Sequence, residues 1–246
     1  RCSHARSTTP VPTAASGPYG IAISRNGDVW FTERFGNKIG RFAPSTGTFR
    51  EFRIPTPFAQ PWEIALAPDG NLWFTEEDVN QIGRITPTGG IREFVPPSGS
   101  FPTGITAGQD GRMWYTAEIG DQIGAVEPNG AMTMFTIPSV QVLPWDIVPG
   151  LDGGLWFSEL SGRAIGRIST SGQIVELPVP GAFSGIAGLC AGPDGRLWFT
   201  ENDTHHVAAM DAAGVVQPVL PTGQRPLSVV LGPDGNLWFT EADSNA

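Results

Sequence analysis

The chain has 246 residues and a formal net charge of −9, from 24 acidic and 15 basic side chains. Nucleic acids and anionic membranes bind basic surfaces, so neither is an expected partner. No run approaches the roughly 18 to 20 apolar residues that cross a bilayer. We therefore expect no membrane span and a soluble monomer, either cytoplasmic or exported after removal of a signal that is not present in this chain.

Residues 1–16 are expected to form an N-terminal tail ahead of one domain at 17–246. The segment Ser7–Thr13 resembles the fourth strand of a later repeat, so it is a candidate for an outer strand that closes a ring. The two cysteines, Cys2 and Cys190, are far apart, and a disulfide between them and two free thiols both remain open. The chain stops midway through a repeat, which predicts a processed or fragmentary sequence.

Six tryptophans mark a repeat that runs along the whole chain. They recur at intervals of 40 to 43 residues, at Trp30, Trp73, Trp114, Trp156, Trp198 and Trp238. A fixed period of this length indicates a repeat architecture.

Residues 61–95 show what one repeat contains. Short segments rich in β-branched and aromatic residues are separated by Gly, Pro, Asp and Asn, as in strands joined by tight turns. Four antiparallel strands in about 40 residues predict one blade of an all-β propeller. The second segment, Leu72–Glu76, is apolar at consecutive positions, so we expect both of its faces to be buried, with the tryptophan between blades.

Six blades are predicted to begin near residues 18, 61, 102, 144, 183 and 226. The sixth is incomplete, because no third or fourth strand follows its second strand at Leu237–Glu241. In each blade, the turn after the second strand and the connection to the next blade share one rim. Since the first strand is innermost in a propeller, its first residues are expected to surround the mouth of the central channel on that rim, a natural concave site.

The residues that follow each blade start are candidates for substrate binding. They are Tyr19, Trp62, Thr103, Trp145, Ser184 and Leu227. These positions vary while the turns and second strands barely change, as a ligand site on a constant scaffold requires. The large side chains predict a flat apolar platform. The alternative is that they plug the channel and bind nothing.

Two acidic residues beside this mouth, Glu63 and Asp146, lie outside the repeat consensus. They are candidates for a catalytic base or for metal ligands, since Mg²⁺ and Ca²⁺ take carboxylate oxygens. The second strands also end in carboxylates on this rim, except at Ala117. These are Glu33, Glu76, Glu159, Glu201 and Glu241. A residue present in nearly every blade is expected to hydrogen-bond neighbouring loop amides, although Glu241 is also a catalytic candidate.

His205 and His206 lie in the turn after the second strand of the fifth repeat, where the first repeat has Asn37 and Lys38. We expect a solvated pair of loop histidines, with contact to a metal or substrate as the alternative.

The repeated Pro-x-Gly-Ile, Pro-Asp-Gly-x-Leu-Trp-Phe-Thr-Glu and Asn-x-Ile-Gly-Arg units are very similar to the virginiamycin B lyase (streptogramin B lyase) family, from Pro18 to Glu241. This resemblance implies seven blades, of which the chain holds six pairs of first and second strands. It also implies an antibiotic-resistance activity, the Mg²⁺-dependent elimination that linearises cyclic depsipeptides. Tyr19 matches a pocket-lining tyrosine of the family. Leu227 stands where the family has a histidine of Pro-His-x-Ile, and the final blade, which carries further catalytic residues, is absent from this chain.

Three hypotheses therefore remain open. The chain is a lyase-like propeller that binds an apolar cyclic or aromatic ligand with doubtful catalysis, a non-catalytic propeller that recognises a peptide, a glycan or a protein, or a lactonase-type propeller with a cation held partly by Glu63 and Asp146.

Overall fold

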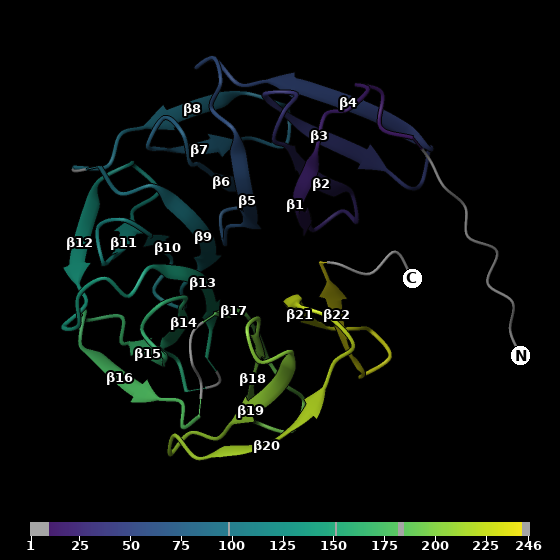
Figure 1. Cartoon of the computed structure of the whole chain (residues 1–246). Coiled ribbons are helices and arrows are strands. Elements are labelled where there is room, and N and C mark those ends of the chain that lie inside the picture. Colours follow the sequence, from purple (N-terminus) through teal and green to yellow (C-terminus); the bar gives the residue numbers. More distant parts are fainter. Residues whose placement is uncertain (1–9, 98, 151, 182–184, 243–246) are drawn as a thin grey trace, which may run out of the picture.

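The structure, a computed structural model, describes residues 10–97, 99–150, 152–181 and 185–242. These residues form 22 strands in six antiparallel sheets, five with four strands and the last with two. The sheets are arranged around a central axis with β1, β5, β9, β13, β17 and β21 innermost (Figure 1). The predicted all-β propeller of four-stranded antiparallel blades is confirmed.

Each blade follows the chain from its inner to its outer strand. The first three blades are β1 (Pro18–Ile23), β2 (Val29–Glu33), β3 (Lys38–Ala43), β4 (Thr48–Arg53); β5 (Pro61–Leu66), β6 (Leu72–Glu76), β7 (Gln81–Ile85), β8 (Ile91–Phe94); and β9 (Pro102–Ala107), β10 (Met113–Ala117), β11 (Gln122–Val126), β12 (Met132–Thr136).

The last three are β13 (Pro144–Pro149), β14 (Leu155–Glu159), β15 (Ala164–Ile168), β16 (Ile174–Pro178); β17 (Ile186–Ala191), β18 (Leu197–Glu201), β19 (His206–Met210), β20 (Val216–Pro221); and β21 (Pro226–Leu231), β22 (Leu237–Glu241). The fifth blade therefore begins at Ile186, three residues after the start expected at Phe183.

The core consists of apolar clusters between neighbouring blades. In the cluster between the first two blades, Trp30 of β2 packs with Leu72 and Phe74 of β6, and three similar clusters join blades two to five. Burial of this apolar surface on both faces of each second strand is the main stabilising term of such a fold. Trp238 of the sixth blade is 60% exposed, because no described blade follows it.

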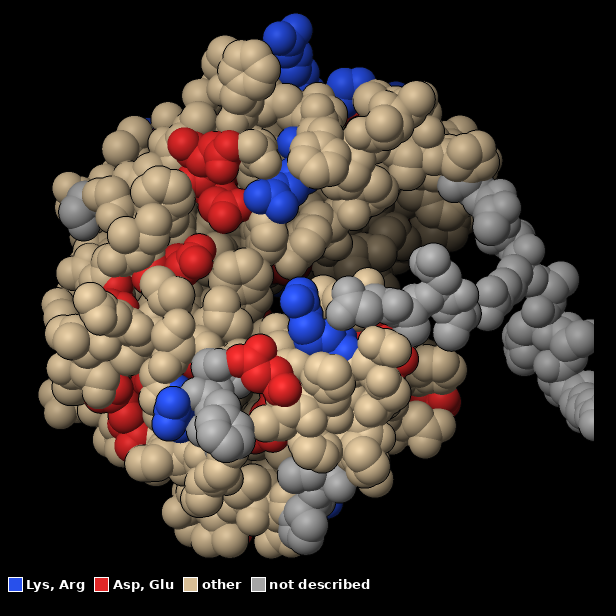
Figure 2. Space-filling model, in the orientation of Figure 1, with Lys and Arg blue, Asp and Glu red and all other residues tan. Residues whose placement is uncertain are grey.

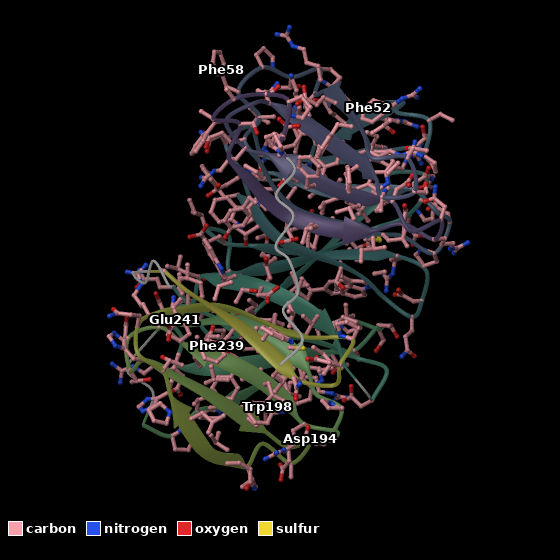
Figure 3. The ribbon with its side chains drawn as sticks, turned by 90° about the vertical axis from the view of Figure 1, so that its right-hand side faces the viewer. Phe52, Phe58, Asp194, Trp198, Phe239 and Glu241 are labelled. Carbon is pink, nitrogen blue, oxygen red and sulfur yellow. The ribbon has the colours of Figure 1, made fainter. Side chains whose placement is uncertain are left out.

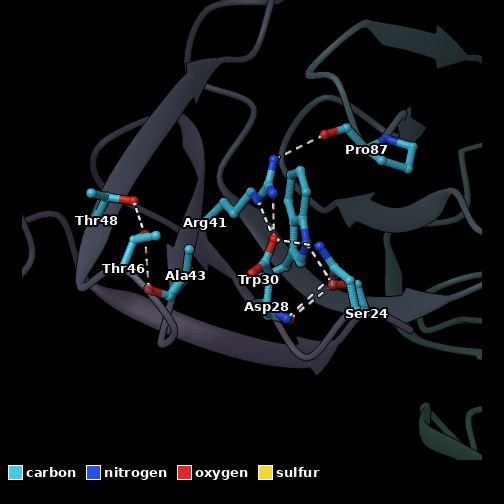
Figure 4. A network of polar contacts seen from close by, with 9 residues as sticks. Ser24, Asp28, Trp30, Arg41, Ala43, Thr46, Thr48 and Pro87 are labelled. Atoms are coloured by element: carbon cyan, nitrogen blue, oxygen red, sulfur yellow. Dashed lines mark hydrogen bonds and ion pairs between the residues drawn. The ribbon is translucent and has the colours of Figure 1, made fainter.

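The turn aspartates orient the marker tryptophans. Asp194 accepts a hydrogen bond from Trp198 Nε1 at 3.2 Å, and the two residues lie close together in Figure 3. In the first blade, Trp30 Nε1 instead donates to Ser24 Oγ, while Asp28 pairs with Arg41 (Figure 4). The repeated Asp therefore fixes the turn and the indole that follows it.

A hydroxyl group near the end of four of the second strands connects consecutive blades in the described structure. Thr75 Oγ1 accepts a hydrogen bond from the Glu63 amide at 3.0 Å and donates to the Thr103 carbonyl of the next blade at 2.8 Å. Thr32 links the first blade to Trp62 in the same way. The Thr of the repeated Leu-Trp-Phe-Thr-Glu segment is thus a link between blades, a role that the sequence analysis did not recognise.

The first and sixth blades face the opening of the ring in Figure 1 and each leaves apolar side chains exposed. Ile21 and Ile23 of β1 are each 65% exposed, and Phe239 of β22 is 42% exposed. The described residues thus supply six of the seven sheets that the family resemblance implies.

The described part of the tail, residues 10–16, contains no strand. It lies on the outer strand of the first blade, where the Thr13 amide donates to Glu51 Oε1 at 2.9 Å. Residues 1–9, including Cys2 and His4, are outside the described residues, and Cys190 is a free thiol. In the described part of the chain, no helix is long and apolar enough to cross a bilayer.

Replacing Thr75 by Val keeps the side-chain shape and removes the hydroxyl. We expect the unfolding free energy to fall, because a buried amide loses its acceptor and a buried carbonyl its donor, at about 1 to 3 kcal/mol for each group. Urea unfolding followed by circular dichroism measures the loss. The control is Thr240→Val, since Thr240 is exposed and accepts only from Ser228 at 3.2 Å. An equal fall in the unfolding free energy of Thr75→Val and Thr240→Val would contradict the role of the Thr75 hydroxyl as a link between blades.

Candidate functional site

A bulge near the start of each innermost strand shifts the residues that follow its first position. In β1, Pro18 pairs with Glu33 but Ile21 pairs with Phe31, so β1 holds one extra residue over this interval. The same shift occurs in the other five blades. Bulges of this kind re-aim side chains, and here they place corresponding residues from all six blades at one end of the channel.

The pairing also shows which residues correspond in the fifth blade. Ile186 pairs with Glu201 as Pro18 pairs with Glu33, so Ala187 occupies the position of Tyr19. The alignment that placed Ser184 at this position is therefore corrected, and Ser184 itself lies outside the described residues.

Aromatic rings from three blades meet at the mouth. The ring centroids of Tyr19 and Trp62 are 4.1 Å apart, and those of Trp62 and Trp145 are 5.4 Å apart in an edge-on arrangement. Trp62 is only 9% exposed, whereas Tyr19 is 49% exposed and Trp145 is partly buried. The three rings therefore pack on one another, and the accessible apolar surface is provided mainly by Tyr19 and Trp145.

The other two described mouth candidates behave differently. Thr103 is fully buried, and its hydroxyl donates to the Trp145 carbonyl at 3.0 Å, so it supports the next blade. Leu227 is 38% exposed and adds a small apolar surface on the sixth blade.

Arg34, which the sequence analysis did not single out, lies directly over Trp62. Its guanidinium carbon is 4.0 Å from the ring centroid, Nε donates to Gln60 Oε1 at 3.0 Å, and Nη2 is 3.0 Å from Glu77 Oε2. A cation stacked on an indole stabilises both groups. Arg34 directly follows the second strand of its blade, as Glu77 does in the next blade. This difference between repeats was the signal in the sequence that could have identified it.

Glu63 and Asp146 are both brought to the mouth beneath these rings. Burial raises the pKa of Glu63 to about 7, with the Ile64 amide opposing and the Asp146 charge adding to the shift. Burial also raises the pKa of Asp146 to about 6, against hydrogen bonds from the Leu189 and Ile147 amides. Burial and Glu63 together raise the pKa of the Tyr19 hydroxyl to about 12, so it stays protonated. Both carboxyls therefore change charge near neutral pH.

The two acids at the mouth are already engaged by backbone amides. Both Asp146 oxygens accept backbone amides, as does Glu63 Oε1. In the described part of the chain, no group of three His, Cys, Asp or Glu side chains could hold a metal ion.

The carboxylates at the ends of the second strands do not share one role. Glu241 accepts hydrogen bonds from the Gly223 and Gln224 amides, as expected, and Glu201 accepts one from the Thr204 hydroxyl. The expectation of loop-amide partners is wrong for three others, whose buried oxygens have no donor in the described structure. These are Glu33, Glu76 and Glu159.

His205 lies in the turn before β19 with a φ of 59°, and His206 begins β19. The corresponding Asn37 accepts a hydrogen bond from the Ala59 amide of the next connection at 2.7 Å. Figure 3 places Phe58 of that connection and Glu241 on the same side of the molecule. Seen from this side, acidic side chains gather to the left of and below a central hollow that basic side chains also border (Figure 2). The turns after the second strands and the connections between blades therefore form the rim of the mouth.

The fold and site define a β-propeller whose channel mouth carries packed aromatic rings above two acids. The chain belongs to the virginiamycin B lyase family, whose model matches residues 4–246.

Several solved structures resemble it. A catalytically inactive variant of virginiamycin B lyase from Staphylococcus aureus, solved with quinupristin, is 35% identical with a TM-score of 0.90, and the match covers 94% of this chain and 80% of that one. A streptogramin B lyase is 30% identical with a TM-score of 0.86, covering 96% and 86%. A gluconolactonase from Xanthomonas campestris has a TM-score of 0.67 at 15% identity, covering 92% and 83%, which shows the fold alone.

A curated virginiamycin B lyase from Bacillus licheniformis is 54% identical over 35 residues. This match spans 14% of the present chain and 12% of that protein.

Replacing Glu63 by Gln tests its raised pKa. In the wild type, the stability contributed by this carboxyl is fully present below about pH 4.5 and is lost as pH rises through about 7. Gln does not ionise, so the variant should gain on the order of 2 kcal/mol relative to wild type between pH 5 and 8. Urea unfolding at both values measures this change. The exposed Glu127→Gln is the control, and equal pH dependence of the wild type and Glu63→Gln would contradict the prediction.

Proposed function

We propose that this chain is a streptogramin-lyase-like propeller that binds an apolar cyclic or aromatic ligand at the channel mouth, and that binding, without turnover, is its function. The observation that carries the proposal is the meeting of Tyr19, Trp62 and Trp145 from three blades at one mouth. The similarity to a lyase solved with quinupristin supports this ligand class.

The mouth offers contacts suited to such a ligand. Tyr19 and Trp145 supply apolar surface, and the Tyr19 hydroxyl, protonated at neutral pH, is a donor for a carbonyl oxygen. Arg34 stacks on Trp62 and holds it in place, so Trp62 supports the two accessible rings. A preformed cluster of this kind loses little conformational entropy on binding.

Elimination would need a base and a group that stabilises the developing negative charge. Leu227, at the position of the family's histidine, cannot transfer a proton. Glu63 and Asp146 have pKa values suited to a base, but backbone amides bond both. These features support binding without turnover.

A second candidate, recognition of a peptide or protein, is favoured by exposed apolar side chains on the same rim. Phe58 is 83% exposed, Phe35 73% and Ile119 59%. They lie on turns and connections of the first three blades, around the mouth. A partner larger than an antibiotic would cover them together with Tyr19.

The binding prediction uses a streptogramin B antibiotic titrated into the protein by calorimetry. Tyr19→Ala and Trp145→Ala should each weaken binding by roughly tenfold or more, equivalent to about 1.4 kcal/mol, because each removes accessible apolar contact. The control is Trp238→Ala, which removes an equally large but distant ring that is 60% exposed. Undiminished binding by both mouth variants would contradict the proposed site.

The absence of turnover is tested by incubating the protein and the antibiotic with Mg²⁺. Chromatography with mass spectrometry separates the intact ring, an eliminated product of unchanged mass and a hydrolysed product that has gained water. We expect the intact ring. Rapid formation of the eliminated product would overturn the claim that Leu227 prevents chemistry, and hydrolysis would favour a lactonase-type activity.

A further inference from the structure

Three blades contain a buried carboxyl group that no described donor reaches, namely Glu33 of the first blade and those of the second and fourth. Glu76 ends β6 and Glu159 ends β14, and each is 0% exposed with both oxygens unbonded. An ionised carboxylate in such a place is costly, because burial removes its hydration without compensation.

A second carboxyl group lies beside each of them, across the third strand of the blade. Gly83 pairs with Phe74 on one side and Glu93 on the other. A Cβ on Gly83 would lie 2.7 Å from Glu76 Oε1, so the glycine leaves the room in which the carboxyls of Glu76 and Glu93 approach. Gly166 and Glu176 hold the corresponding positions beside Glu159.

In the first and third blades the two carboxyls are present or absent together, whereas Glu201 of the fifth blade has no carboxyl on its fourth strand and accepts from the Thr204 hydroxyl instead. In the third blade, Gly124 pairs with Met134, and the second strand ends at Ala117, so both carboxyls are absent together. In the first blade, Glu33 and Glu51 are both present, but Lys38 lies 2.6 Å from Glu51. Lys38 is the only lysine of the chain. A cation therefore balances the pair in that blade.

We propose that Glu76 with Glu93, and Glu159 with Glu176, are proton-binding sites, each pair sharing one proton across the centre of its blade. The protonated carboxyl donates to the ionised one, so the buried oxygens gain their missing hydrogen bond. In these blades the shared proton balances the charge of the carboxyl pair, as Lys38 does in the first blade.

The electrostatic surroundings agree with this assignment. Burial, and then the neighbouring carboxyl of Glu93, raise the pKa of Glu76 to about 8. Burial and Glu176, with a further contribution from Asp121, raise the pKa of Glu159 to about 8. Glu93, Glu176 and Asp121 are the charged groups that act on the two sites, and all are acidic.

The sites are connected to the rim of the mouth. Glu93 Oε1 accepts a hydrogen bond from the Thr56 amide at 2.9 Å, and Glu176 Oε2 accepts one from the Ser139 amide at 3.2 Å. These amides belong to the connections that lead to Trp62 and Trp145. Loss of the shared proton places two like charges together and loosens the fourth strand and the connection it holds.

The test compares the wild type with Glu76→Gln, Glu159→Gln and the double variant by thermal unfolding between about pH 5 and 9. The contribution of a raised carboxyl is complete below about pH 4.5 and is lost as pH rises through 8. The wild-type Tm should fall by several degrees over this range. Each single variant should remove part of the fall and the double variant more, because the Gln amide donates at every pH.

A matched variant places a lysine in the second blade at the position that Lys38 occupies in the first. Gln81 pairs with Glu76 as Lys38 pairs with Glu33, so Gln81→Lys should abolish the pH dependence of the second blade and leave that of the fourth. At about pH 9, amide exchange in residues 54–60 should also be slower in Glu76→Gln than in wild type. An unchanged pH profile in the Gln variants would overturn the proposal. Recovery of the wild-type Tm at this pH on addition of millimolar Mg²⁺ or Ca²⁺ would instead assign the pairs to a metal ion.

Discussion

Consecutive blades are joined by a side-chain hydroxyl that accepts from the inner strand of its own blade and donates to the inner strand of the next. Thr32, Thr75 and Thr116 make this link between the first four blades, and Thr200 makes it to the sixth. Because apolar packing between blades is not directional, these bonds fix the height at which neighbouring inner strands meet. The position of every mouth residue depends on that height.

The close approach of neighbouring inner strands also determines at which positions acidic side chains fit. A Cβ on Gly20 would lie 2.7 Å from the Trp62 carbonyl and 2.9 Å from Glu63 Oε1. Gly104 is equally close to the backbone at Trp145 and Asp146, so the first and third blades make room for the acids of the second and fourth. Burial of these acids raises both pKa values. The inner strands that build the scaffold therefore also carry the residues of the candidate site.

Much of the fold followed from the repeat of turns and tryptophans, since Trp73 and its equivalents lie between blades as their apolar sequence predicts. The fifth blade was misaligned because Gly185-Ile186 resembles Gly20-Ile21, whereas the strand pairing equates Gly188 with Gly20. The predicted platform was only partly right. Trp62 is covered by Tyr19, Trp145 and Arg34, and contacts between blades so far apart in sequence carry no local signal.

By itself, the sequence determined the number and order of strands, the rim on which variable residues gather, and the family, because local turn chemistry and a fixed period specify each blade independently. Only the tertiary structure decided which of the repeated carboxyls are bonded. Glu241 meets loop amides, whereas Glu76 meets another carboxyl across Gly83. The reason is physical: the charge state of a buried acid depends on the groups that face it from other strands, and identical repeats do not have identical neighbours.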